Sequence, residues 1–111
     1  MKYTYVDGSG NKYKLQNSKL TYIPLTPENS SSGTYSGGDP FVLELEKIDL
    51  IRLVDVFERA LWSESDHSNK RRMGSGTLFK TVGEDWKRIY LSYGSTSINE
   101  IDAILKSIKS V

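Results

Sequence analysis

The chain has 111 residues, a length that suits a single domain around one hydrophobic core, and we expect residues 1–111 to form that domain. Its 15 basic and 14 acidic residues leave a net charge of +1, which provides no overall field to attract nucleic acid, anionic lipid or an acidic substrate. The absence of cysteine excludes disulfides, thiolate catalysis and cysteine-based zinc sites.

The first 24 residues predict a meander of three antiparallel strands. Residues 2–6 alternate, with Tyr3 and Tyr5 on one face, and turn-forming residues separate this strand from strands at 12–15 and 20–23. Pro24 ends the third strand because it cannot donate a ladder hydrogen bond. The segment lacks the apolar core of a signal peptide, and no later run approaches the roughly 20 apolar residues of a membrane span, so we expect a cytoplasmic protein.

Residues 25–40 contain almost nothing to bury and predict a long surface loop. Its centre is rich in serine and glycine, and glycines let successive backbone N–H groups point inward beside the hydroxyls. Ser31, Ser32 and Tyr35 are therefore candidate ligands for a phosphate or carboxylate. The loop lacks the spacing and the lysine of a P-loop, so a solvated connector remains the alternative interpretation.

A short strand at 41–45 and an amphipathic helix at 47–62 follow, and the apolar stripe of that helix comprises Leu50, Leu53, Val54, Phe57 and Leu61. Residues 63–76 predict an exposed loop, and 77–82 and 86–93 predict a hairpin. The last helix begins near Ser97, which forms an S-x-x-E capping box with Glu100, and its apolar stripe comprises Ile98, Ile101, Ile104, Leu105 and Ile108.

These elements predict an α+β fold with the order β-β-β-(β)-α-β-β-α. Each helix must bury one apolar stripe, and each alternating strand must have one face covered. An antiparallel sheet of about five to six strands with both helices packed on one face satisfies both requirements.

The loop at 63–76 holds a second group of candidate ligands, namely His67, Arg71 and Arg72. A guanidinium group binds phosphate or carboxylate through two parallel hydrogen bonds, and the serine-rich loop would complete one pocket if it folded nearby. The alternative is a solvated loop whose cations are balanced by Glu64 and Asp66.

We predict no catalytic residue, no metal site and no cofactor. His67 is the single histidine and the natural general base, but the serines beside it do not lie in a nucleophile elbow, and no metal-ligand spacing is present. Trp62 is assigned a structural role. A further set of aromatic residues could form a sheet face that stacks bases or docks a partner, although we favour half-burial in the sheet for most of them: Tyr3, Tyr5, Tyr13, Tyr22 and Trp86.

Two functions remain open. The first is a small noncatalytic domain that binds another protein or regulates it, through the aromatic face or the long loops. The second is an anion-binding or enzymatic domain in which the two loops converge on a phosphorylated or carboxylated ligand. We expect neither nucleic acid nor a membrane as a partner, and the oligomeric state stays open.

Overall fold

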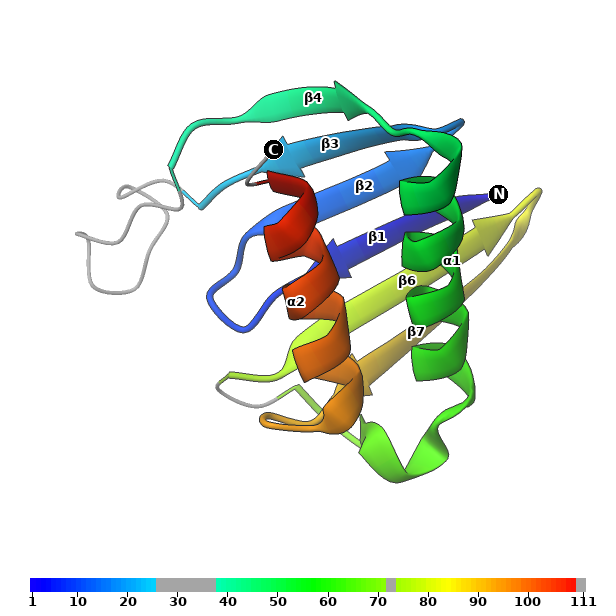
Figure 1. Cartoon of the computed structure of the whole chain (residues 1–111). Coiled ribbons are helices and arrows are strands. Elements are labelled where there is room, and N and C mark those ends of the chain that lie inside the picture. The colour runs from blue at the N-terminus through cyan, green and yellow to red at the C-terminus, as the bar shows by residue number, and fades with distance from the viewer. Residues whose placement is uncertain (26–37, 72–73, 110–111) are drawn as a thin grey trace.

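The computed structural model describes residues 1–25, 38–71 and 74–109, which form one antiparallel sheet with two helices on the same face (Figure 1). The helices are α1 (Lys47–Trp62) and α2 (Thr96–Lys109). The described residues supply seven strands in the spatial order β4-β3-β2-β1-β6-β7-β5. Their bounds are β1 (Lys2–Val6), β2 (Lys12–Gln16), β3 (Lys19–Ile23), β4 (Phe41–Glu44), β5 (His67–Ser68), β6 (Gly76–Val82) and β7 (Asp85–Leu91). The predicted α+β architecture is confirmed.

Tight turns set the register of two hairpins. Asn17 and Ser18 join β2 to β3 with φ values of 50° and 64°, and a two-residue turn with positive φ at both positions matches the twist of the strands that it connects. Gly83, with φ of 59°, begins the turn between β6 and β7. Between these hairpins, α1 carries the chain across the sheet from the β4 edge, so that β6 pairs with β1 (Figure 1).

The strand count exceeds the prediction because of β5, which lies inside the segment predicted as an exposed loop. His67 and Ser68 pair with Leu91 and Tyr90 of β7. Because His67 and Ser68 are both polar, the sequence shows no alternation of hydrophobic and polar residues there. Nothing in the local sequence therefore distinguishes this strand from a loop. Their strand conformation depends on the edge of β7, which is a long-range partner.

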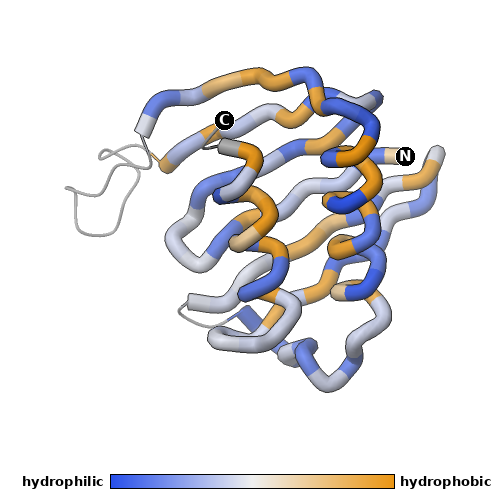
Figure 2. The backbone as a smooth tube through the Cα atoms, viewed as in Figure 1, coloured by the Kyte–Doolittle hydropathy of each residue, from blue (hydrophilic) through white to orange (hydrophobic). Residues whose placement is uncertain are grey.

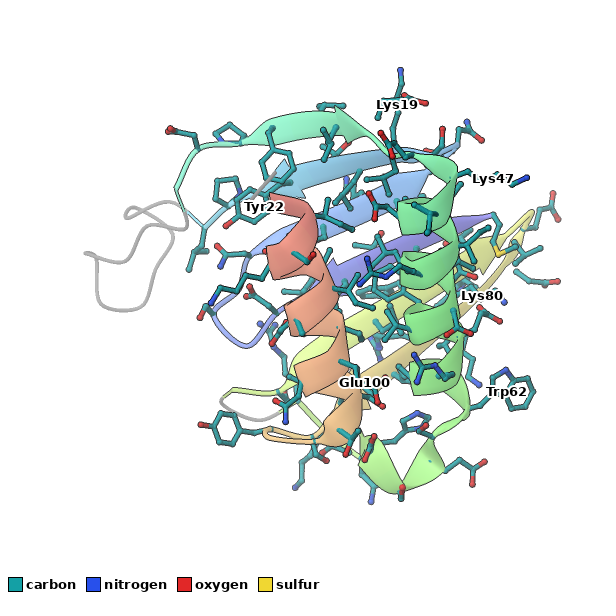
Figure 3. The ribbon with its side chains drawn as sticks, in the orientation of Figure 1. Lys19, Tyr22, Lys47, Trp62, Lys80 and Glu100 are labelled. Atoms are coloured by element: carbon teal, nitrogen blue, oxygen red, sulfur yellow. The ribbon has the colours of Figure 1, made fainter. Side chains whose placement is uncertain are left out.

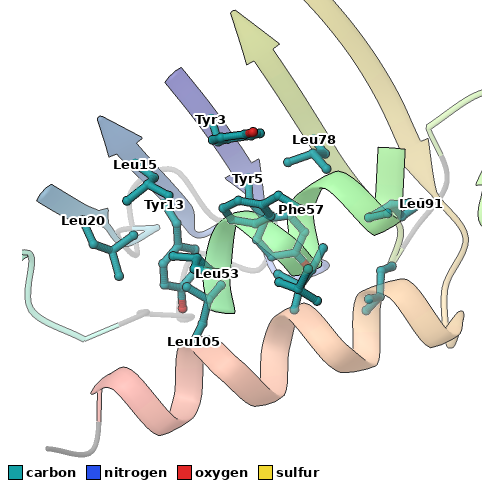
Figure 4. Packing of buried hydrophobic residues seen from close by; sticks show 14 of the residues in the cluster. Tyr3, Tyr5, Tyr13, Leu15, Leu20, Leu53, Phe57, Leu78, Leu91 and Leu105 are labelled. Carbon is teal, nitrogen blue, oxygen red and sulfur yellow. The ribbon is translucent and has the colours of Figure 1, made fainter. Parts of the chain in front are cut away.

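Four tyrosines of the meander belong to the buried core on the helix side of the sheet. Figure 4 labels three of them, Tyr3, Tyr5 and Tyr13. Tyr3 stacks on Phe57 of α1 with ring centroids 5.3 Å apart, and Tyr5 lies 6.3 Å from the same ring. Ring contacts then continue through Tyr13 and Tyr22 to β4. Since aromatic pairs add stabilisation beyond the area they bury, this row of rings anchors α1 on the sheet.

The apolar faces of both helices point toward the sheet, and Figure 2 shows hydrophobic and hydrophilic residues alternating along them. The predicted stripe of α2 is confirmed, with Ile104 only partly buried. In α1, Val56 and Ala60 are buried while Leu50 and Val54 are only partly so. The stripe is displaced because α2 lies against the flank of α1 that carries Val56 and Ala60.

Polar contacts fix the helices to the sheet and to each other. The Tyr5 hydroxyl donates to Asp102 of α2 at 2.9 Å, and burial, followed by the charge of Asp102, raises the pKa of Tyr5 well above its ordinary value. The Tyr3 hydroxyl donates to Glu58 of α1 at 2.6 Å. Arg59 and Glu100 form an ion pair between α1 and α2, with a nitrogen-to-oxygen distance of 2.8 Å.

We predict that Ile101→Ala lowers the free energy of unfolding by about 2 to 5 kcal/mol, because Ile101 is fully buried between α2 and the sheet and its truncation leaves a cavity. Ile51 of α1 is 58% exposed, so Ile51→Ala should change the free energy of unfolding by less than about 0.5 kcal/mol. Urea unfolding of both variants measures the difference. Equal unfolding midpoints would show that α2 is not docked on the sheet.

Candidate functional site

The two loops predicted to converge on a ligand are described only in part. Ser31, Ser32 and Tyr35 fall within 26–37, and Arg72 falls within 72–73, all outside the described residues. For these four the ligand-binding assignment stays a prediction. His67 and Arg71 are described, and they lie on opposite faces of the sheet, since His67 pairs with the buried Leu91 whereas Arg71 lines the opposite surface.

Two side chains around His67 form hydrogen bonds with the end of α1 and with the start of α2. The Nε2 atom of His67 lies 2.8 Å from the carbonyl oxygen of Ala60, and because a carbonyl only accepts, Nε2 carries the proton and donates it to the end of α1. Asp66 accepts hydrogen bonds from the backbone N–H of Ser97 at 3.1 Å and from its hydroxyl at 2.6 Å. The expected capping box is therefore wrong, because Asp66 caps α2 and Glu100 pairs with α1 instead.

The tyrosines do not form an exposed aromatic platform. Tyr3, Tyr5, Tyr13 and Tyr22 are at most 6% exposed, because they contact the helices rather than solvent. The base-stacking or docking hypothesis is wrong for these four residues. Trp86, the fifth member of the predicted set, lies on the other face of the sheet and is 67% exposed.

We call the side of the sheet opposite the helices the open face, and it carries a concavity of about 560 Å³. Successive side chains of a strand point to opposite faces, so the residues of the open face alternate with the buried core residues. Four central strands, β1, β2, β6 and β7, contribute to the concavity together with the segment after β5. Its lining comprises Lys2, Thr4, Val6, Lys12, Lys14, Arg71, Thr77, Phe79, Thr81, Arg88 and Tyr90.

Five of the eleven described residues of this lining are cations, and none of the eleven is acidic. A second concavity of about 380 Å³ shares Lys2 and Lys14 with the first and adds Lys19, and the part of its lining that the structure describes also contains no acidic residue. The two concavities thus form one continuous surface, to which the residues with described positions contribute six cations: Lys2, Lys12, Lys14, Lys19, Arg71 and Arg88. At its β4 edge, Glu44 stands opposite Lys19 and accepts a hydrogen bond from the Ser18 hydroxyl.

Charge is distributed unevenly over the near-neutral chain. Its formal net charge is +1, and the six cations and Glu44 of the open face sum to +5, which leaves −4 for all other residues. Residues 46–66 together with α2 carry eight acidic and five basic residues, a net charge of −3 in the helical layer. Net charge therefore gives no measure of the potential on the open face.

Three aromatic side chains lie beside these cations. Phe79 of β6 stands opposite Arg88 of β7, and Trp86 and Tyr90 lie two residues to either side of Arg88. Phe79 is thus a diagonal cross-strand neighbour of both Trp86 and Tyr90, a relation that separates two residues by roughly 7–8 Å. The Arg88 guanidinium lies 5.2 Å from the centroid of the Tyr90 ring. The open face therefore combines positive charge with aromatic surface.

Sequence reasoning identified Arg71 and Trp86 but missed the other members of this surface. The available signal was the two-residue alternation within each strand. It places Lys2, Lys12 and Lys14 on the other face of the sheet from the tyrosines of the same strands. Alternation assigns a face within one strand, but it does not show that β1 lies between β2 and β6. Without that long-range pairing, the cations of the meander could not be placed next to Phe79 and Tyr90.

The chemistry of this surface is suited to holding anions, because ammonium and guanidinium groups bind phosphate or carboxylate and aromatic rings stack on flat ligands. Among the described residues, no three His, Asp or Glu side chains are grouped so as to hold a metal ion. No described helix is long and apolar enough to cross a membrane. No model of a protein family matches the chain, and no curated protein or solved structure matches it either.

We predict that Asp66→Ala lowers the free energy of unfolding by about 1 kcal/mol, since it removes the acceptor of two hydrogen bonds at the start of α2. Glu64 is exposed and close by in sequence, so Glu64→Ala serves as the control and should have an effect below about 0.5 kcal/mol. Thermal or urea unfolding distinguishes the two. If the variants are equally stable, Asp66 is not the cap.

Proposed function

We propose that this domain is a noncatalytic binding module and that its open face binds a polyanionic partner. The observation that supports this is the lining of the two joined concavities, whose described residues include six cations and no carboxylate. Like charges held close together on one surface repel one another, and a partner with complementary charge relieves that repulsion and accelerates association.

A binding role fits the surroundings of the one histidine better than catalysis does. The imidazole of His67 donates to Ala60, and the neighbouring Asp66 caps α2, so both side chains hold the helices in place. The hydroxyls on the open face belong to Thr4, Thr77, Thr81 and Tyr90. Among the lining residues that the structure describes, no carboxylate or histidine lies beside these hydroxyls to act as a general base.

Other occupants fit the open face less well. A second copy bound through the same face would bring twelve cations together, and like charges across an interface cost several kcal/mol.

An acidic protein would supply the negative charge that complements the six cations, and it agrees with the sequence-based expectation of a protein partner. The cytoplasmic location stays part of this proposal.

The test is the binding of fluorescently labelled heparin, a polyanion without aromatic groups, to two charge-matched variants. Lys12→Glu with Lys14→Glu reverses two charges of the open face, whereas Lys47→Glu with Lys106→Glu reverses two on the helices, where Figure 3 shows Lys47 at the start of α1. The open-face variant should bind at least about tenfold more weakly, and the slope of log affinity against log salt should fall by about 2.

The helix variant should keep wild-type affinity, because the two charges that it reverses lie away from the open face. Its net charge nevertheless changes by the same amount as that of the open-face variant. Equal loss of affinity in both variants would mean that net charge alone determines binding. Absence of heparin binding by the wild type at low salt would refute the proposal outright.

A further inference from the structure

We infer that the polyanion bound by the open face is a single-stranded nucleic acid, whose bases stack on Trp86, Phe79 and Tyr90 while its phosphates lie against the lysines. This inference rests on the proposed function and specifies the chemistry of the partner. Its basis is the position of these three rings among the cations of one sheet surface.

The three rings are not part of the hydrophobic core. The core cluster of the described residues lies on the helix side and contains the four meander tyrosines and Phe57. Trp86 is 67% exposed, and Phe79 and Tyr90 are half-buried in the concavity. Exposed aromatic residues interspersed with cations are typical of surfaces that bind single strands, where each ring accepts a base of any sequence.

The register of the sheet repeats one lysine and one ring in three successive rows across the strands. Lys2 pairs with Thr81, which pairs with Trp86. In the next row, Thr4 joins Lys14 to Phe79. In the third row, Lys12 connects through Val6 and Thr77 to Tyr90.

These rows are two residues apart along each strand, a separation of about 7 Å. In every row the lysine comes from β1 or β2 and the ring from β6 or β7. The surface therefore presents a line of positive charges beside a line of aromatic rings. A polymer with one negative charge and one flat base in each repeat matches this pattern, whereas an acidic peptide or a sulfated glycan matches only the charges.

A single strand fits this arrangement better than a duplex. The bases of a double helix are stacked on one another and cannot reach rings on a sheet, whereas unpaired bases can stack on aromatic side chains. The rings carry no directional code for one base, so we expect little sequence preference.

The net charge of +1 was the ground for expecting no nucleic-acid partner, but it does not oppose this inference. Electrostatic attraction is local, because the Debye length is about 8 Å at physiological ionic strength. The acidic residues of α1 and α2 are separated from the open face by the thickness of the sheet and its core, which is about 10 Å. Six phosphate contacts would give a slope of log affinity against log salt of about −4.

The experiment measures the affinity of a labelled oligo(dT) of about 12 nucleotides for wild type, Tyr90→Ala and Tyr90→Phe by fluorescence anisotropy. We expect Tyr90→Ala to weaken binding by about fivefold or more, because it removes one stacking partner. Tyr90→Phe keeps the ring and should stay within about twofold of wild type. Heparin affinity should be the same for all three proteins, since heparin has no bases.

Trp86→Ala provides a second variant if Tyr90→Ala reduces the urea midpoint, because Trp86 is the most exposed of the three rings. If both alanine variants bind oligo(dT) as wild type does while Lys12→Glu with Lys14→Glu loses it, the polyanion proposal stands and this inference is wrong. Polyglutamate or duplex DNA that binds as tightly as oligo(dT) also overturns it. Failure to bind either oligo(dT) or heparin overturns both proposals.

Discussion

A continuous row of aromatic rings determines which face of the sheet the helices cover. Phe57 of α1 contacts Tyr3 and Tyr5 in the central strand β1, and the contacts continue through Tyr13 and Tyr22 toward the β4 edge. Aromatic side chains bury large apolar areas, so docking the helices on the opposite face would leave the four tyrosine rings in water. The position of both helices follows from this row.

Because the helices cover one face of the sheet, the side chains that point to the other face stay exposed. In β1 and β2, each buried tyrosine or leucine is flanked by a lysine, threonine, valine or glutamine that points the other way. Since the core is complete on the helix side, the composition of the open face is not constrained by packing. Apart from the contact of Arg88 with the Tyr90 ring and the position of Lys19 opposite Glu44, the structure shows no folding role for the described cations of this face, which is why we assign them to recognition of a partner.

Elements whose signal is local were predictable, whereas features that depend on strand order were not. The stripe of α2 was predicted because Ile98, Ile101 and Leu105 repeat at helical spacing over about two turns. The strand β5 was missed because His67 and Ser68 become extended only against β7. The capping of α2 by Asp66 was missed because its donor at Ser97 lies 31 residues away. The open face was missed for the same reason, since it combines strands from both ends of the chain.

The two tryptophans allow the central claim to be tested in a single spectrum. Trp86 lies on the open face, whereas Trp62 projects from the end of α1, where the Lys87 ammonium lies 5.8 Å from its ring (Figure 3). Each indole N–H gives its own signal in a ¹H–¹⁵N correlation spectrum. On titration with oligo(dT), the Trp86 signal should shift progressively while the Trp62 signal stays in place. A shift of the Trp62 signal alone, or of neither signal, would contradict the assignment of binding to the open face.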